Sequence, residues 1–446
     1  MLCLPSSLTE LLLLFAPCFS RPTYRTFCAM VVGQISQTSL RTVTGMLVGA
    51  RLSGVWHHAR AHRFFSSARW SADELGLRLA GLIVERLCEP GAPVLVAVDD
   101  TLLHRLGRKI HACFWHHDAT ANTDKAAVAW GNNWVVVGIC VRLPFLERTV
   151  CLPVLFRLWQ PRRPEYAKLD PERPGKPVLA REMVDLLAAR LPDRQIDVVG
   201  DAAYATEAWR GLSDRVTITS RLRSNAVLYE RKPERTGKRG RPRKWGKRLP
   251  SLGEIATNPA TAWVEHTVRR YGKTETLKLA IIDCLWEPLG AETPVRVILV
   301  NDDTKPQGYQ LALITTDLTA TTGQIVERYA DRWPIEVAFE EGKELFGVGD
   351  ARNRTNKAVE RTIPFQFMTM TLIFIWYTLH GHHPADVDHH RALRPWYLSK
   401  TAPSFADMLA KLRRVIIACQ FHPSQGRAPK PGEIAQVQQA WAAAGL

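Results

Sequence analysis

The nine cysteines of this 446-residue chain include no Cys-x-x-Cys pair, which argues against a zinc ribbon and a disulfide framework. No Lys or Arg precedes Arg21, so the apolar stretch before it lacks the basic start of a secretory signal. The apolar segment 365–379 is shorter than the roughly 20 residues of a membrane span. Internal repeats and a glycine-rich phosphate loop are also absent. We therefore expect a soluble, cytoplasmic protein that uses its apolar segments as core helices.

Acidic residues are scarce relative to basic ones. The chain has 43 Asp and Glu against 59 Lys and Arg, which gives a net charge of +16. Hydrophobic residues at 46% and charged residues at 23% are typical of globular proteins and exclude wholesale disorder. The positive excess points to a polyanionic partner, most often nucleic acid.

Apolar periodicity divides the chain into helical and β-rich parts. Residues 1–90 show helical spacing with many basic and aromatic residues, which suits either a solvated helix face or a DNA-binding region. From residue 93, short β-branched runs and one helical pattern predict a mixed sheet with helices packed on it. The expected strands are 94–99, 133–143, 149–158, 196–201 and 216–222, and the expected helix is 178–191.

A basic segment interrupts this pattern. Residues 231–248 contain ten basic residues and one acid, and their Gly and Pro content predicts an exposed loop. A second β-rich stretch follows, and 321–347 then reads as one long helix or a helix pair that Pro334 kinks or begins. The predicted organisation is a helical region at 1–90, a first core part at 91–222, a β-rich basic insertion at 223–315, core helices at 316–380 and a helical tail at 381–446.

Three aspartates follow apolar runs typical of buried strands. Asp99 and Asp100 end VLVAVDD, and Asp201 ends IDVVGD. Each has a structural explanation as a cap at a strand end. Because sites in open α/β sheets lie at the carboxyl ends of strands, the three together predict a Mg²⁺ site with oxygen ligands. The helix at 321–347 offers further ligands, among which spacing alone does not choose: Glu327, Glu336, Glu340, Glu341 and Glu344.

Four residues of that helix carry a family resemblance. Tyr329, Arg332, Glu336 and Lys343 are separated by two, three and six residues. This Y-(2)-R-(3)-E-(6)-K spacing resembles the YREK signature of DDE-class bacterial insertion-sequence transposases, and it follows two Asp-ended strands and a β-rich stretch. An ordinary amphipathic helix with an Arg332–Glu336 ion pair is the structural alternative.

The resemblance implies an RNase H-like α/β core with an all-α N-terminal domain. It implies a metal-binding catalytic triad of Asp99, Asp201 and Glu336, with Asp100 as the alternative to Asp99. Two Mg²⁺ ions, for which Mn²⁺ can substitute, would support cleavage at the element ends and strand transfer into target DNA. The expected partners are the terminal inverted repeats, target DNA and a second copy of the chain, in a bacterial nucleoid-associated setting. Tyr329, Arg332 and Lys343 would contact phosphates.

The basic segment has two interpretations. Its Arg-Gly-Arg-Pro core resembles a minor-groove AT-hook, whereas non-specific phosphate neutralisation needs only its charge. The candidate DNA-binding residues are Arg239, Arg241, Arg243 and Lys244. Two other functions remain open for the chain: a domesticated relative that binds DNA without cutting, and a metal-dependent nucleotidyl- or glycosyltransferase.

Overall fold

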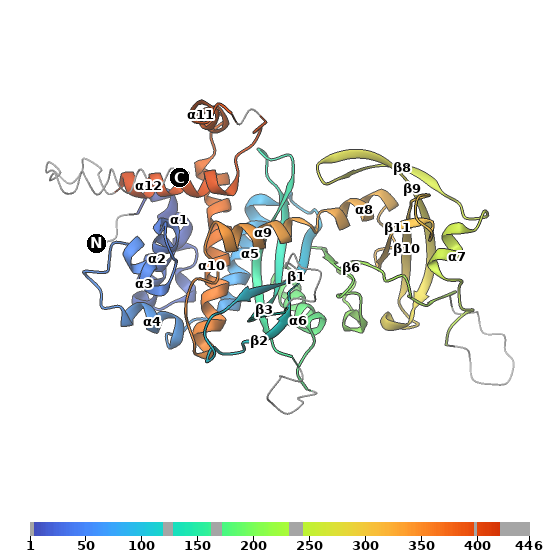
Figure 1. Ribbon diagram of the computed structural model, residues 1–446, viewed down its shortest axis with the longest axis horizontal. Coiled ribbons are helices and arrows are strands. Elements are labelled where there is room, and N and C mark those ends of the chain that lie inside the picture. Colours follow the sequence, from blue (N-terminus) through green and yellow to red (C-terminus); the bar gives the residue numbers. More distant parts are fainter. Residues whose placement is uncertain (1–3, 119–127, 162–171, 232–243, 397–398, 420–446) are drawn as a thin grey trace.

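The computed structural model describes residues 4–118, 128–161, 172–231, 244–396 and 399–419. Figure 1 shows an elongated molecule with the N-terminal helices at one end, a twisted sheet in the middle and the strands of the insertion at the other end. The predicted α/β class, with an all-α N-terminal part and a β-rich insertion, is confirmed. The division into five segments stays a prediction.

The described N-terminal residues are helical, as predicted. Their helices are α1 (Ser6–Leu13), α2 (Arg21–Ser36), α3 (Val43–Gly49), α4 (Ala59–Ser66) and α5 (Ala72–Leu87). Side-chain oxygens begin two of them, because Thr42 accepts a hydrogen bond from the Gly45 amide and Ser71 from the Glu74 amide. The buried residues of these helices join one apolar core with the central strands.

The central strands have the order of an RNase H-like sheet. They are β1 (Val94–His104), β3 (Val128–Arg142), β4 (Thr149–Trp159), β5 (Ile196–Gly200) and β6 (Val216–Arg221). The order is β4-β3-β1-β5-β6, with antiparallel pairs from β4 to β1 and parallel pairs from β1 to β6. Helix α6 (Lys176–Arg190) lies between β4 and β5 in the chain and packs on β3 and β4.

Strand β1 is longer than the sequence predicts, so Asp99 and Asp100 do not end it. It runs to His104 because it stays paired with β3, whereas its pairing with β5 stops at Val98 and Gly200. Strand β3 likewise begins before the expected residue 133, because residues 128–132 belong to it. The short strand β2 (Phe114–His117) pairs with the same end of β3. Gly138 is needed in β3 because a Cβ there would lie 2.3 Å from the Cys151 Sγ.

The insertion extends the same sheet beyond β6. It contains β7 (Leu228–Tyr229), α7 (Leu252–Thr257), β8 (Val264–Arg270), β9 (Lys273–Trp286), β10 (Pro294–Asn301) and β11 (Tyr309–Thr315). Strand β11 pairs with β6, and the order continues through β10 and β9 to β7. The insertion and the core are therefore joined by backbone hydrogen bonds across one continuous sheet.

The predicted helix pair follows the insertion. Helix α8 (Thr322–Ala330) begins with a capping box between Thr321 and Gln324, and α9 (Pro334–Glu344) begins at Pro334, as expected for a proline in a first helical turn. Helix α8 packs on β8, and α9 packs on β4 and β1. The pair therefore leads from the insertion back to the central strands (Figure 1).

Helix α10 (Asn356–Trp376) stands between the N-terminal helices and the sheet (Figure 1). With the π-turn Tyr377–Gly381 it forms a 26-residue helix that is long and apolar enough to cross a membrane, and 89% of its apolar window is buried inside the protein. The sequence argument that this segment is too short is thus wrong, while its place in the core is as expected. The described C-terminal helices are α11 (Asp386–Leu393) and α12 (Phe405–Cys419).

Candidate active site

The edge of the sheet where β5 ends brings together the predicted carboxylates. The parallel pairing of β1 with β5 stops at Val98 and Gly200, so Asp99 and Asp201 are the next residues on two neighbouring strands. Glu336 lies in the first turn of α9, which packs on β1. Two strands and one helix thus converge on one place.

An arginine links the first and third carboxylates. Arg332, in the junction between α8 and α9, donates from one terminal nitrogen to Asp99 Oδ2 at 2.6 Å and from the other to Glu336 Oε1 at 2.8 Å. The side chains of Arg332 and Asp99 are 11% and 15% exposed, whereas that of Glu336 is 37% exposed. The result is an Asp99–Arg332–Glu336 ion cluster, which is exposed to solvent at Glu336.

Burial dominates the electrostatics of the Asp99–Arg332–Glu336 cluster. Burial raises the pKa of Asp99 to about 7, with a further increase from nearby Asp201 and an opposing decrease from Arg332. Burial alone would lower the pKa of the Arg332 guanidinium, but Asp99 and Glu336 outweigh it and raise that pKa. Even with Arg332 beside it, Asp99 therefore has a pKa near neutral pH, mainly because it is buried.

Asp100 faces other partners. Successive side chains of a strand point to opposite faces, so Asp100 lies away from Arg332 and forms an ion pair with Lys176 Nζ at 2.5 Å. The Tyr204 hydroxyl donates to Asp100 Oδ1 at 3.4 Å. Gly200 permits this approach, because a Cβ there would lie 2.8 Å from the Cβ of Tyr204. The structure thus groups Asp99, and not Asp100, with Arg332 and Glu336.

Asp201 occupies a tight turn after β5. Its carboxylate accepts a hydrogen bond from the Ala203 amide at 2.8 Å, and its carbonyl accepts one from the Ser220 hydroxyl at 2.6 Å. Burial strongly raises the pKa of the neighbouring Tyr204 phenol, and the charges of Asp100, Asp99 and Asp201 add to the effect. All three aspartates therefore lie around one buried tyrosine, which the sequence analysis did not single out.

The predicted DNA-contacting residues of the helix pair differ in how close they lie to the three carboxylates. The Tyr329 ring lies 5.9 Å from the Arg332 guanidinium, beside the carboxylates. Lys343 is half-buried, and the charges that act on its pKa, which burial lowers, are those of Asp118 and Glu344. Tyr329 and Arg332 are thus close to the triad, whereas no contact with it is recorded for Lys343 among the described residues.

The basic segment lies largely outside the described residues, which exclude Arg239, Arg241 and Arg243. Lys244 is exposed and lies over the Trp245 ring at 5.7 Å. The adjoining Arg248 pairs with Tyr229 in β7, and the sheet order places β6, β11, β10 and β9 between β5 and β7. The described part of this segment is therefore remote from the carboxylates.

The donor set suits a hard cation. Carboxylate oxygens are the ligands that Mg²⁺ prefers, and Asp99, Asp201 and Glu336 supply such oxygens. In the part of the chain that the structure describes, however, no group of three His, Cys, Asp or Glu side chains lies close enough together to hold one ion. The carboxylates therefore suit Mg²⁺ in their chemistry. In this structure, the positions of Asp99 and Glu336 are set by their hydrogen bonds to Arg332.

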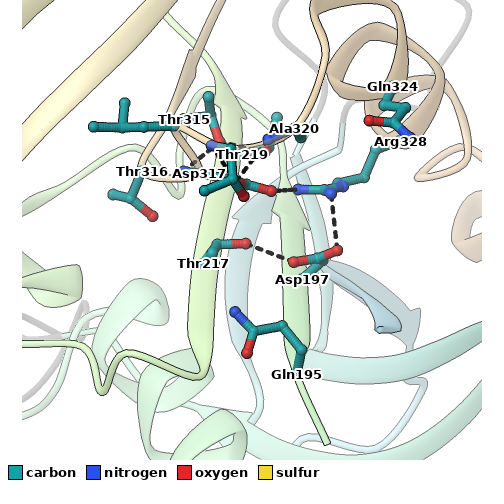
Figure 2. Close-up of polar contacts among 12 residues, drawn as sticks. Gln195, Asp197, Thr217, Thr219, Thr315, Thr316, Asp317, Ala320, Gln324 and Arg328 are labelled. Carbon is teal, nitrogen blue, oxygen red and sulfur yellow. Dashed lines mark hydrogen bonds and ion pairs between the residues drawn. The ribbon is translucent and has the colours of Figure 1, made fainter. Parts of the chain in front are cut away.

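A second buried ion cluster lies on the same helix pair. Figure 2 shows Arg328 of α8 between Asp197 of β5 and Asp317, which follows β11. The guanidinium nitrogens lie 2.9 Å from Asp197 Oδ2 and 3.0 Å from Asp317 Oδ2. The Thr217 hydroxyl donates to Asp197, and two donors of Thr319 and the Ala320 amide bind Asp317. Asp197 begins β5 and Asp201 follows it, so this cluster ties α8 to the sheet at the end opposite the triad.

A groove adjoins the junction of α8 and α9. It has a volume of about 580 Å³ and lies between the β3–β4 turn, the β8–β9 turn, the start of α9 and residues 400–408. Its cationic residues are Arg142, Arg148, Arg269 and Lys400, and it also contains the acidic residues Glu147, Asp331 and Glu341. Trp333, next to Arg332, is 50% exposed at its wall. The groove thus lies toward the end of the sheet where β1 begins, and none of Asp99, Asp201, Arg332 and Glu336 lines it. Sequence reasoning did not identify this groove.

Comparison with known proteins gives one match. A family model described as DDE superfamily endonuclease matches residues 14–280, which is more than half of the chain and includes Asp99 and Asp201. The match ends within β9, so α8 and α9 with Glu336 lie beyond it. No curated protein matches the chain. With an RNase H-like sheet and a family match of this length, the chain belongs to the DDE superfamily of endonucleases.

Proposed function

We propose that this endonuclease is an insertion-sequence transposase of the YREK group, which cleaves DNA at the element ends and joins them to target DNA. The observation that carries the proposal is the chain from Asp99 through Arg332 to Glu336, beside Asp201. It brings Asp99 inside β1 and Asp201 just after β5 to one place with two residues of the Y-(2)-R-(3)-E-(6)-K spacing. An ordinary amphipathic helix accounts for the Arg332–Glu336 pair but not for the second bond of Arg332, to Asp99 on a strand.

The carboxylates would act as metal ligands. Asp99, Asp201 and Glu336 would hold up to two Mg²⁺ ions, which supply activation of water or a 3′-hydroxyl and stabilise the leaving oxygen. The turn of Asp201 is fixed by the Ala203 amide and the Ser220 hydroxyl, so this ligand is positioned before DNA binds. Glu336 is more exposed and lies on the helix pair, which suits a ligand that meets the DNA.

Phosphate binding would fall to the cations around the junction of α8 and α9. Arg332 offers a planar fork that matches phosphate geometry, and Tyr329 offers a hydroxyl. Because strand transfer joins two element ends, we also propose that the chain acts as a homodimer on DNA.

The decisive experiment is cleavage of a plasmid that carries the DNA flanking the gene, in Mg²⁺, by the wild type and by Glu336→Gln. We expect cuts at the element ends by the wild type and a loss of roughly 10³-fold or more in the variant, which equals about 4 kcal/mol of transition-state stabilisation. Glu340→Gln is the matched control, because Glu340 is exposed on the same helix, one turn further on. It should cut like the wild type.

Two results would count against the proposal. If the wild type and both variants bind the DNA but none cuts, the chain is a domesticated binder. If Glu336→Gln and Glu340→Gln cut equally well, the third ligand is not Glu336, and the YREK assignment is wrong.

A further inference from the structure

The position of Arg332 conflicts with its expected contact with a phosphate. Both terminal nitrogens of the guanidinium are bound, one to Asp99 and one to Glu336, and the side chain is only 11% exposed. In this arrangement the residue neutralises two of the three carboxylates that a divalent cation would need. The guanidinium and the cation call for the same oxygen atoms, Asp99 Oδ2 and Glu336 Oε1.

The hydrogen bonding of Arg332 is incomplete. Within the described residues, its Nε is buried without a hydrogen-bond partner. A buried donor without a partner carries a desolvation cost, so the arginine gains if it moves to a ligand that uses more of its donors. Phosphate is such a ligand, because it can accept parallel hydrogen bonds from the Nε and a terminal nitrogen of a guanidinium, and other oxygens can bind the remaining nitrogen. The Asp99–Arg332–Glu336 cluster is exposed to solvent at Glu336, so an approaching phosphate can reach it there.

We propose that Arg332 is an exchangeable counter-ion: in the DNA-free protein it holds Asp99 and Glu336 in place of a divalent cation, and a DNA phosphate draws it away. This inference rests on the proposed function, since it assigns the three carboxylates to metal binding. Its consequence is positive coupling, in which DNA favours the cation and the cation favours DNA to the same extent. The protein would then hold its cations tightly only when substrate is present.

The neighbouring Arg328 also bridges two carboxylates, but its surroundings differ from those of Arg332. Hydrogen bonds from Thr217, Thr319 and Ala320 complete the cluster of Arg328. The carboxylates of Arg328 are 7% and 10% exposed, which leaves no open end like that of Glu336. Exchange is therefore assigned to Arg332 and not to Arg328.

The test measures Mn²⁺ binding by electron paramagnetic resonance and calorimetry, with and without a duplex that carries the element end. Without DNA, Arg332→Gln should bind Mn²⁺ about tenfold more tightly than the wild type, because the competing charge is gone. Arg332→Lys, which keeps a charge but not the fork, should lie between the two. Arg142→Gln is the control: it removes an arginine charge that contacts Asp331 and none of the triad, and should change Mn²⁺ binding little.

The coupling provides a second measurement. The duplex should raise the Mn²⁺ affinity of the wild type about tenfold and that of Arg332→Gln clearly less. Equal or weaker Mn²⁺ binding by a folded Arg332→Gln, checked by circular dichroism, would overturn the inference and leave the proposed function intact. If that variant does not fold, Arg332→Lys decides by the same comparison. If Glu336→Gln leaves the Mn²⁺ affinity of the wild type unchanged, with and without DNA, the metal site itself is wrong and both proposals fail together.

Discussion

Arg328 and Arg332 are one helical turn apart in sequence, and each bridges two carboxylates, yet their surroundings differ. Arg328 joins Asp197 to Asp317 at the start of β5, where threonine hydroxyls and backbone amides complete the cluster (Figure 2). Arg332 joins two carboxylates at the other end of β5, with one nitrogen left without a partner among the described residues. Similar residue types thus form a closed ion cluster and an open one.

The pKa values reflect this difference only in part. Burial by itself would raise the pKa of Asp317, but hydrogen bonds from Thr319 and Ala320, together with Arg328, lower it from its ordinary value near 3.8 to about 2. Asp99 has fewer such donors, and burial raises its pKa to about 7. Burial is the largest effect at these carboxylates, and it is outweighed only at Asp317; at Asp99, and also at Asp197 of the closed cluster, burial prevails and the pKa is raised.

The largest expected effect is on stability. Arg328→Gln leaves two buried carboxylates without their cation and should lower the free energy of unfolding by about 3–5 kcal/mol. Arg332→Gln should cost only about 1–2 kcal/mol, because Asp99 can take up a proton instead. Urea unfolding followed by circular dichroism measures both. Arg142→Gln, at an exposed pair, is the control and should stay within about 0.5 kcal/mol of the wild type. Equal losses of stability at positions 328 and 332 would contradict the difference between the closed and the open cluster.

A smaller effect concerns pH. Because the pKa of Asp317 is lowered on folding, its contribution is fully present above about pH 4 and is lost as the pH falls through 2. After allowance for screening by solvent, we expect Asp317→Asn to lose about 1–2 kcal/mol of this pH-dependent stability at neutral pH, and progressively less in acid. Urea unfolding between pH 3 and pH 7 measures the difference from the wild type. Asp185→Asn, at an exposed pair with Arg181, should show almost none. A difference that does not shrink toward pH 3 would contradict the assignment.

The smallest expected effect belongs to cations that are fully solvated. Lys244→Gln and Lys247→Gln should leave stability unchanged, since both side chains are exposed. Each should weaken duplex binding a few-fold on all sequences and reduce the salt slope by about one, as for a single phosphate contact. Binding to A·T-rich and G·C-rich duplexes at several salt concentrations measures this. A loss confined to A·T-rich DNA would favour the minor-groove interpretation instead.

The sequence predicted the α/β class, the helix pair and the region of the site, because each depends on local patterns. Apolar runs located β1 and β5, and Pro334 located the start of α9. The end of β1 was missed because antiparallel pairing with β3 carries the strand past its charged residues. Roles for Asp99, Asp201 and Glu336 stay predictions.

The closed cluster was not predicted from the sequence. Asp197 is a single charge inside an apolar strand, and such a charge requires a buried partner. That signal was present, but the partner lies 131 positions away in Arg328, and pairing at this distance depends on the tertiary fold. The groove beside Trp333 was missed for the same reason, since its walls come from five separate parts of the chain.

Helix α10 has a consequence for how the protein is made. Its side chains fill the space between the N-terminal helices and β4, so the faces of α2, α4 and α5 have no complete partner until residues 356–376 leave the ribosome. At about 5–20 residues per second, the earlier part of the chain waits for tens of seconds with apolar surface exposed. Completion of the core is thus postponed until most of the chain has been synthesised, and any shortened product that ends before α10 is left with an unfinished interior.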